Sequence, residues 1–544
     1  MLTKLIDPEK LEDTILSNSH YHNPNNRKDD TEFVSQNKYQ LPENGLSEEL
    51  TYQLLHNDLS LDGNPTLNLA SFVNTFSTET AKELAKENIV KNLADADEYP
   101  TLMDLTQRNV SILGKLWNRT SEEPVGTATT GSSEAIMLGG LAMKKIWQER
   151  QKAAGKDYYK PNILMGSNAQ VALEKFARYF DVEARLIPVS EKSNHVLDLT
   201  KIEENIDENT IGIFVILGST YTGAFEDVEQ VSKILDKIEE EKGIYVPIHV
   251  DGASGAFVAP FIYPELKWDF RIPRVVSINT SGHKFGLTTA GLGWIIWKDK
   301  KHLPEGLIFK LRYLGSVEES YTLNFSRPGY QSIHQYYNFL HLGSKGYREI
   351  HHRSLKNARV LSNFLEKTQY FECISNIHRK KGQLTFDPSL SREELANEDN
   401  EDSYYNKGLP VVAFKFRDEF KQQYPHIPQA LLSTLLRKRG WIIPNYPLPP
   451  NEEATEILRV VVRYELTDDL LFRLISDILK TTQALIKSSI FYQQSVDATS
   501  AADKNRYIYD LLTSIASGGE EDINSHEKKQ DHKKNHHTTF KGTC

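Results

Sequence analysis

The stretch VVSINTSGHK, residues 275–284, joins a strand-like segment to a glycine turn directly after it. Short apolar strands are predicted at NILMG (162–166), IGIFVIL (211–217), VPIHVDG (246–252) and LGWIIW (292–297). Helical stretches separate them, and residues 226–243 carry apolar side chains at helical spacing up to a stop at Gly243. Strands that alternate with helices predict an α/β domain with a mostly parallel sheet.

The pattern divides the chain of 544 residues into four segments, since this length exceeds what one hydrophobic core usually serves. Residues 1–65 are polar and predict an arm with short helices, and residues 66–345 predict the large α/β domain. Residues 346–494 predict a smaller C-terminal α+β domain with an acidic insertion near 385–408. Residues 495–544 predict one amphipathic helix and a disordered tail.

Composition argues against several classes of partner. Lys and Arg number 64 against 74 Asp and Glu, so a net charge of −10 gives no reason to expect nucleic acid or an acidic membrane surface. The apolar runs are too short to span a bilayer and the N-terminus has no long apolar core, which predicts a cytoplasmic protein. Cys373 and Cys544 alone cannot build a thiolate metal cluster, and we predict no metal.

Lys284 is the candidate reactive residue of the opening stretch. A lysine buried among apolar and cationic neighbours has a lowered pKa, and its uncharged amine can form an imine. Asp251 ends the run 246–252, where an unpaired carboxylate is costly unless a cation lies beside it. Taken singly, Lys284 could also be a surface lysine in a turn, and Asp251 could be a helix cap.

A candidate phosphate site lies at TATTGSSEAIMLGG, residues 127–140. Gly131, Ser132 and Ser133 open an apolar helix, and the N–H groups and dipole of a helix N-terminus favour an anion, although simple capping is the alternative. With an imine-forming lysine and an aspartate that can hold a protonated pyridine nitrogen, this cradle predicts pyridoxal 5'-phosphate (PLP) as the cofactor. The order of cradle, aspartate and lysine predicts the PLP-dependent transferase fold of type I.

Several segments between residues 65 and 485 match one known family. They include NLASFVNTF (68–76), KNLADADEYP (91–100), GSTYTGAFE (218–226), HVDGASGAFVAPF (249–261), INTSGHKFGL (278–287), RGWIIPNYPLP (439–449) and LRVVVRYE (458–465). On these segments the chain resembles glutamate decarboxylases, the fungal ones in particular, within the group II PLP-dependent decarboxylases. The resemblance implies a carboxy-lyase that converts L-glutamate to 4-aminobutanoate (GABA) and CO2.

The resemblance also implies the cofactor contacts. Lys284 would form the imine, Asp251 would pair with the pyridine nitrogen, and His283 would contact the phosphate and the substrate side of the imine. Further contacts would come from Ser132, Ser133 and Ser281 at the phosphate, Gln170 over the ring, Ala253 under it and Thr220 at its edge. Phe325 and Ser326 would reach the phosphate from a neighbouring subunit. The resemblance thus implies a homodimer or larger homo-oligomer with shared active sites.

The substrate pocket is implied on three further segments, by Ser71, Phe72, Asn92, Asp95 and Arg459. The planar guanidinium of Arg459 can hold the α-carboxylate through two hydrogen bonds, although a surface arginine on an edge strand is an equal alternative. Ser71 and Asn92 would donate hydrogen bonds to the γ-carboxylate. An amino acid without that group would leave these two side chains unpaired and would be rejected.

Tyr313 lies in KLRYLGSVEESYT (310–322), a stretch that resembles the mobile active-site flap of the family. We expect it to assist protonation of the product carbon. Two other functions stay open at this point: a PLP-dependent lyase acting on another amino acid, and a non-catalytic scaffold of the same fold. Calmodulin is not expected as a partner, because NRYIYDLLTSIA (505–516) has no tryptophan and few basic residues.

Overall fold

The computed structural model describes residues 39–311, 318–383 and 404–497, and single residues between 500 and 507. The chain forms two compact units, Met1–Asn64 and Pro65–Cys544. Helix α3 (Glu48–Leu59) belongs to the first unit and begins at Ser47, whose side chain accepts a hydrogen bond from the backbone of Leu50. All elements named below belong to the second unit.

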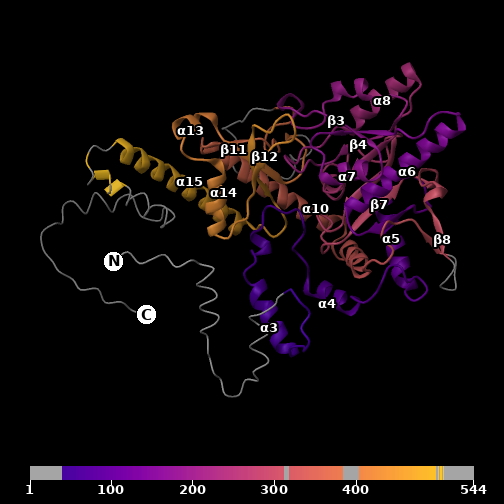
Figure 1. Ribbon diagram of the computed structural model, residues 1–544, viewed down its shortest axis with the longest axis horizontal. Helices are drawn as coiled ribbons and strands as arrows, with labels where there is room; N and C mark the ends of the chain where they lie inside the picture. Colours follow the sequence, from indigo (N-terminus) through magenta and orange to yellow (C-terminus); the bar gives the residue numbers. More distant parts are fainter. Residues whose placement is uncertain are drawn as a thin grey trace. The chain divides into compact units, whose positions relative to one another are not determined.

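A mixed sheet of seven strands, counted within the described residues, is the centre of the second unit (Figure 1). Its order is β1–β7–β6–β5–β4–β2–β3, with bounds β1 (Gly126–Thr129), β2 (Asn162–Gly166), β3 (Glu183–Ile187), β4 (Thr210–Ile216), β5 (Ile248–Asp251), β6 (Val275–Ser281) and β7 (Gly293–Trp297). Strand β7 runs antiparallel to both of its neighbours, and the other pairs are parallel. The predicted α/β class with a mostly parallel sheet is therefore confirmed.

Helices cover this sheet closely, and its central strands are buried. Strands β4, β6 and β7 are buried along their whole length, as expected when both faces of a sheet are covered. Helix α6 (Ser132–Ala153) packs against β6 and β7, and α5 (Pro100–Leu116) packs against β1. Gly140 lets α6 approach α7 (Val171–Tyr179), since a Cβ at this position would lie 2.5 Å from the Phe176 ring.

The helix expected within residues 226–243 is α8 (Val228–Lys242). Asp227 caps its N-terminus by accepting a hydrogen bond from the backbone of Gln230. Gly243 ends it in the left-handed conformation, at a φ of 67°. The stop predicted at Gly243 is confirmed, and the cap at Asp227 explains where the helix begins.

A second, antiparallel sheet follows later in the chain, in the order β10–β11–β13–β12 (Figure 1). Its strands are β10 (Phe371–Cys373), β11 (Val411–Phe416), β12 (Asn445–Pro447) and β13 (Glu456–Val461), and its helices are α13 (Asp418–Gln423), α14 (Gln429–Lys438) and α15 (Asp468–Asp497). The domain boundary between 345 and 346 stays a prediction. It falls inside α10 (Tyr330–Lys367), whose two halves meet at Gly343.

The remaining elements are short: α4 (Glu79–Glu87), α9 (Ala259–Ile262), β8 (Phe309–Leu311) and β9 (Glu318–Ser320). Most of the acidic insertion expected near 385–408, and most of the stretch 505–516, lie outside the described residues. Across the described part of the chain, every helix is too short or too polar to cross a bilayer.

Candidate active site

A cavity of about 330 Å³ lies where the parallel strands β4, β5 and β6 end. Open sheets of this kind form ligand crevices at the carboxyl ends of their strands. Nine of the residues expected to bind cofactor line the cavity: Ser132, Ser133, Gln170, Thr220, Asp251, Ala253, Ser281, His283 and Lys284. The fold thus brings together residues that are separated by up to 152 positions in the chain.

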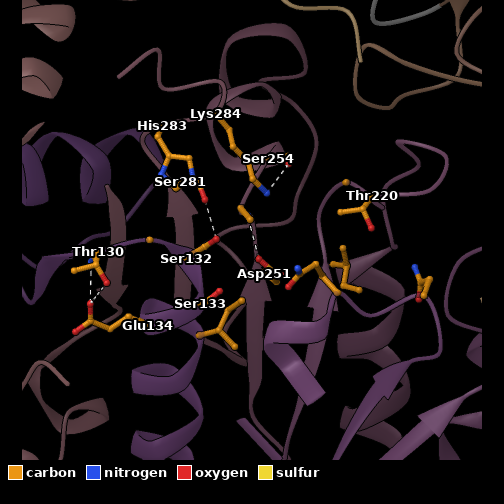
Figure 2. Close-up of a pocket in the computed structure, with 17 residues that line it drawn as sticks. Thr130, Ser132, Ser133, Glu134, Thr220, Asp251, Ser254, Ser281, His283 and Lys284 are labelled. Atoms are coloured by element: carbon orange, nitrogen blue, oxygen red, sulfur yellow. Dashed lines mark hydrogen bonds between the residues drawn. The ribbon is translucent and has the colours of Figure 1, made fainter. Parts of the chain in front are cut away.

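Lys284 follows β6 and extends into this cavity (Figure 2). Its amine is 3.5 Å from Ser254 Oγ and 5.4 Å from the centroid of the Phe72 ring. Desolvation lowers the pKa of Lys284, and the charge of Arg459 adds to the effect, while Asp251 opposes it. A lysine in this environment has a larger share of the uncharged amine that an imine requires.

Asp251 is the last residue of β5 and is buried. Its Oδ1 accepts hydrogen bonds from Ala253 N at 3.0 Å and from Asn279 Nδ2 at 2.9 Å. Within the described part of the chain, Oδ2 has no hydrogen bond. The carboxylate is therefore oriented by one oxygen and keeps the other for a cationic partner in the cavity.

The N-terminus of α6 forms a polar cradle on the same cavity. Gly131 is the N-cap residue, and no side chain within the described residues caps the helix, so simple capping does not account for this motif. The hydroxyls of Ser132 and Ser281 are 2.8 Å apart (Figure 2). Free N–H groups, the helix dipole and two hydroxyls suit a phosphate.

His283 lies beside this cradle. Its Nδ1 is 2.7 Å from the carbonyl oxygen of Leu292, which can only accept, and 3.2 Å from the backbone nitrogen of Leu292, which can only donate. The shorter contact assigns the proton to Nδ1 and leaves Nε2 as an acceptor. Burial, reinforced by the charge of Lys284, lowers the pKa of His283 to about 4. The imidazole is therefore neutral near pH 7.

Arg459 of β13 and the segment 70–72 meet next to the cavity. The guanidinium donates to the carbonyl oxygens of Thr220, at 2.6 Å, and of Ala70. Its Cζ lies 5.0 Å from the centroid of the Phe72 ring. Its Nε is buried and has no hydrogen-bond partner among the described residues, while the Tyr446 ring packs against the guanidinium, 5.5 Å from Cζ to the ring centroid. Arg459 is thus not a surface arginine on an edge strand.

Ser71 and Asn92, the residues expected at the γ-carboxylate, are not among the residues that line the cavity. The Ser71 hydroxyl accepts a hydrogen bond from Val73 N at 3.1 Å, in a local turn. Asn92 contacts Asp95 Oδ1 and Ser326 Oγ, each at 3.3 Å, and none of the three lines the cavity. Asn92, Asp95, Phe325 and Ser326 are not among the residues that line this cavity, and their contacts with cofactor or substrate stay predictions.

Four further residues of the site were not singled out from the sequence. Ser254 contacts the Lys284 amine, and Asn168 presents a buried Oδ1 at the cavity wall that has no partner in the described part of the chain. Asn279 orients Asp251. Glu134 binds Thr130 N at 2.8 Å and the backbone N–H groups of 323 and 324. Only Glu134 had a local signal, as an acidic residue in the first turn of a helix. Tyr313 lies outside the described residues.

A separate buried cluster contains the potential metal ligands Glu366, Cys373 and His378. Both carboxylate oxygens of Glu366 have protein partners, since His378 Nε2 and a guanidinium nitrogen of Arg379 each lie at 2.7 Å. Burial raises the pKa of Cys373, which favours the protonated thiol over the thiolate that binds metals. Hydrogen bonds and ion pairs of this cluster link α10 to β10 and the segment after it. The predicted lack of a metal stays a prediction.

The cavity residues fit pyridoxal phosphate on their own chemistry. An uncapped helix N-terminus can take the phosphate, the free Oδ2 of Asp251 can face a protonated ring nitrogen, and Lys284 can supply the imine. On a mostly parallel sheet with one antiparallel strand, this combination defines a PLP-dependent enzyme of fold type I.

Comparison with known proteins agrees, and the chain belongs to the pyridoxal-dependent decarboxylase family, whose conserved domain matches residues 49–387. Glutamate decarboxylase of Saccharomyces cerevisiae is 49% identical over 97% of this chain and 93% of its own length. Glutamate decarboxylase 2 of Arabidopsis thaliana is 44% identical over 82% of this chain and 84% of its own length. A solved structure of Lactobacillus brevis glutamate decarboxylase superposes with a TM-score of 0.75 and 36% identity, covering 84% of this chain and 96% of that one. The family resemblance stated from the sequence is confirmed.

Proposed function

We propose that this protein is a PLP-dependent decarboxylase that converts L-glutamate to GABA and CO2. The observation that carries the proposal is the cavity in which Lys284, Asp251 and the N-terminus of α6 meet beside the free Nε of Arg459. The relatives named glutamate decarboxylase, at 49% and 44% identity, support the choice of substrate.

The bound PLP would act as a sink for the electrons of the bond that breaks when CO2 leaves. Lys284 would hold the cofactor through its amine, and Asp251 would place its carboxylate beside the ring nitrogen. Ser132 and Ser281 hold the phosphate at the helix N-terminus. His283, neutral and with Nε2 as an acceptor, can take a proton from a substrate amine nearby.

Arg459 sets the orientation of the substrate in this proposal. A substrate α-carboxylate bound to its Nε would be fixed relative to the protein, because the other guanidinium nitrogens are anchored on Thr220 and Ala70. Phe72 packs between Arg459 and Lys284 and excludes water from that side. Orientation of the scissile bond then decides which group leaves the α-carbon.

Selection of glutamate requires a second subunit in this proposal. Asn92 and Asp95 lie with Ser326 in a cluster that is not part of the cavity of the same chain. In a homodimer with shared sites, this cluster would complete the partner's cavity, with Phe325 and Ser326 near the phosphate and Asn92 at the γ-carboxylate. Ser71 would contribute from the cavity's own chain.

Three smaller parts of the proposal complete it. Tyr313 would assist protonation of the α-carbon after CO2 has left. The protein would work in the cytoplasm, without nucleic acid, membrane or calmodulin as partners. The large domain would span 66–345 and the smaller one 346–494.

One assay tests the proposed function directly. Purified protein with PLP is offered a panel of amino acids, including aspartate and aromatic ones, and CO2 release is measured. We expect release from glutamate and almost none from the others. In Lys284→Ala we expect loss of the imine absorbance and of nearly all activity. Preferred release from another amino acid would replace the substrate, and a coloured, active Lys284→Ala would overturn the catalytic role of this lysine.

A further inference from the structure

A row of buried side chains leads from the interior of the sheet to the carboxylate of Asp251. Ser277 Oγ is 2.7 Å from His249 Nδ1, and His249 Nε2 is 2.7 Å from Asn279 Oδ1. Asn279 Nδ2 then donates to Asp251 Oδ1 at 2.9 Å. Ser277, His249 and Asn279 are fully buried on the adjacent strands β5 and β6, so water does not compete for these hydrogen bonds.

The direction of every hydrogen bond in this row is fixed by its last member. A carboxylate only accepts, so the amide nitrogen of Asn279 faces Asp251 and its amide oxygen faces His249. Nε2 of His249 must therefore carry the proton, and Nδ1 accepts from the Ser277 hydroxyl. Burial lowers the pKa of His249 to about 4, although Asn279 and Asp251 oppose the shift, which keeps the imidazole neutral in this tautomer.

The imidazole of His249 is also held in position by its packing. Helix α6 passes directly over it at Gly139, where a Cβ would lie 2.5 Å from Cε1 and Nδ1 of the ring. Phe214 packs against it edge to face, with ring centroids 5.3 Å apart. Helix α6 can lie this close to His249 only because residue 139 is a glycine and has no side chain.

We propose that His249 is a positioning residue for the decarboxylation, acting through Asn279 on Asp251. All donors in the row point toward the carboxylate, so the row holds Oδ1 in place and polarises the Asn279 amide toward it. With Oδ1 held in this way, Oδ2 would face the ring nitrogen of bound cofactor and favour its protonated form. This inference rests on the proposed function, because it requires PLP in the cavity.

The test compares His249→Leu, which removes both hydrogen bonds, with His249→Gln, which can keep a donor toward Asn279. The matched control is His334→Leu, since His334 is a buried histidine of α10 that takes no part in this row. For each protein we would measure the PLP dissociation constant of the apoprotein, the 15N chemical shift of the ring nitrogen in labelled PLP, and kcat and KM for glutamate. Thermal unfolding reports the cost to stability.

For His249→Leu we expect the PLP dissociation constant to rise and kcat to fall, each by about tenfold, as for other residues that orient the groups of a site without touching the ligand. The nitrogen resonance should move toward the unprotonated position, with KM within about twofold of wild type. His249→Gln should recover most of the loss, and the control should lower only the unfolding temperature. If His249→Leu does not fold, Gly139→Ala displaces the same ring while keeping the histidine, and the same nitrogen shift is expected.

An unchanged nitrogen shift and PLP affinity in His249→Leu and Gly139→Ala would overturn the proposal and leave His249 as a packing residue. Equal losses in His249→Leu and the His334→Leu control would also overturn it. A wild-type protein that binds PLP but releases no CO2 from glutamate would instead overturn the proposed substrate. The nitrogen shift and PLP affinity do not depend on glutamate and would still decide the role of His249.

Discussion

The Arg459 side chain can make several directed hydrogen bonds in one plane at once, which a lysine at this position could not do. Its guanidinium donates to the backbone carbonyls of Thr220 and Ala70, and under the proposed function its Nε would bind the substrate α-carboxylate. Lysine has the charge but lacks the planar arrangement of several donors. The neighbouring Phe72 ring, 5.0 Å from the guanidinium carbon, adds a contact that favours the flat group.

We therefore predict that Arg459→Lys lowers kcat/KM for glutamate by roughly a hundredfold, equivalent to about 2.7 kcal/mol of binding in the transition state. Steady-state kinetics measure the effect, and the PLP absorbance should persist. Arg417→Lys is the control, because Arg417 donates to the carbonyl of Phe371 in the second sheet and is not among the cavity residues. Unchanged kinetics in Arg459→Lys would remove Arg459 from substrate binding.

Among the elements, α10 depends on one glycine and one buried histidine. Its two halves meet at Gly343, which has φ 57° and ψ −175°, a conformation essentially restricted to glycine. A Cβ at Gly343 would meet no atom within 4 Å, so only the backbone conformation resists a side chain there. His351 lies in the second half of α10 and packs among Phe261, Phe285 and Tyr347.

Gly343→Ala should lower the free energy of unfolding by about 1–3 kcal/mol, since alanine must either adopt the strained conformation or shift a helix half. Urea unfolding measures the change. Gly306→Ala serves as the comparison, because Gly306 has equally open space around it without a positive φ, and its cost should be small. Equal costs at both positions would mean that α10 can rearrange freely at Gly343.

His351 should make stability depend on pH. Burial lowers the pKa of His351 to about 3, whereas an unfolded histidine titrates near 6.5. Between these values only the unfolded chain binds the proton, so the free energy of unfolding falls with acidification by up to about 1.4 kcal/mol per pH unit. His351→Phe should flatten the decline between pH 6.5 and 4.5, measured by urea unfolding. His341→Phe, at an exposed position of the same helix, should leave the slope as it is.

For the whole molecule, the cavity that contains Lys284 and the separate cluster of Asn92 with Ser326 lead to a prediction about subunit assembly. Lys284 belongs to the cavity, whereas Asn92 lies in the cluster with Ser326. If the cluster of one subunit completes the cavity of the other, a mixed dimer of two inactive variants has one intact site. Neither cluster would then suffice in a monomer.

Mixing Lys284→Ala with Asn92→Ala subunits should accordingly restore activity to about a quarter of wild type, since random pairing gives half mixed dimers with one good site each. Each variant alone should stay nearly inactive. The measurement is CO2 release after the subunits have been dissociated and reassembled together. No recovery from a mixture that sedimentation shows to contain mixed dimers would place each site within a single chain.

Local patterns in the sequence carried most of the fold. The apolar runs at 162–166 and 292–297 became β2 and β7, and α8 ended where Gly243 indicated. Such features follow from backbone chemistry within a few residues, and a sequence displays them directly. The lysine, the aspartate and the serine cradle were readable as well, because each directly follows a strand or opens a helix.

Contacts between distant segments needed the tertiary structure. Nothing near His249 in the chain shows that Ser277 and Asn279 lie beside it, because parallel strands bring them together only through the register of β5 and β6. Arg459 donates to the carbonyl oxygens of Thr220 and Ala70, which are 239 and 389 positions away in the chain, so only the folded chain shows these contacts. By itself the sequence determined the class of fold, the candidate reactive lysine and the family. Only the folded chain decided which groups orient that site, since hydrogen bonds depend on distances that strand pairing sets.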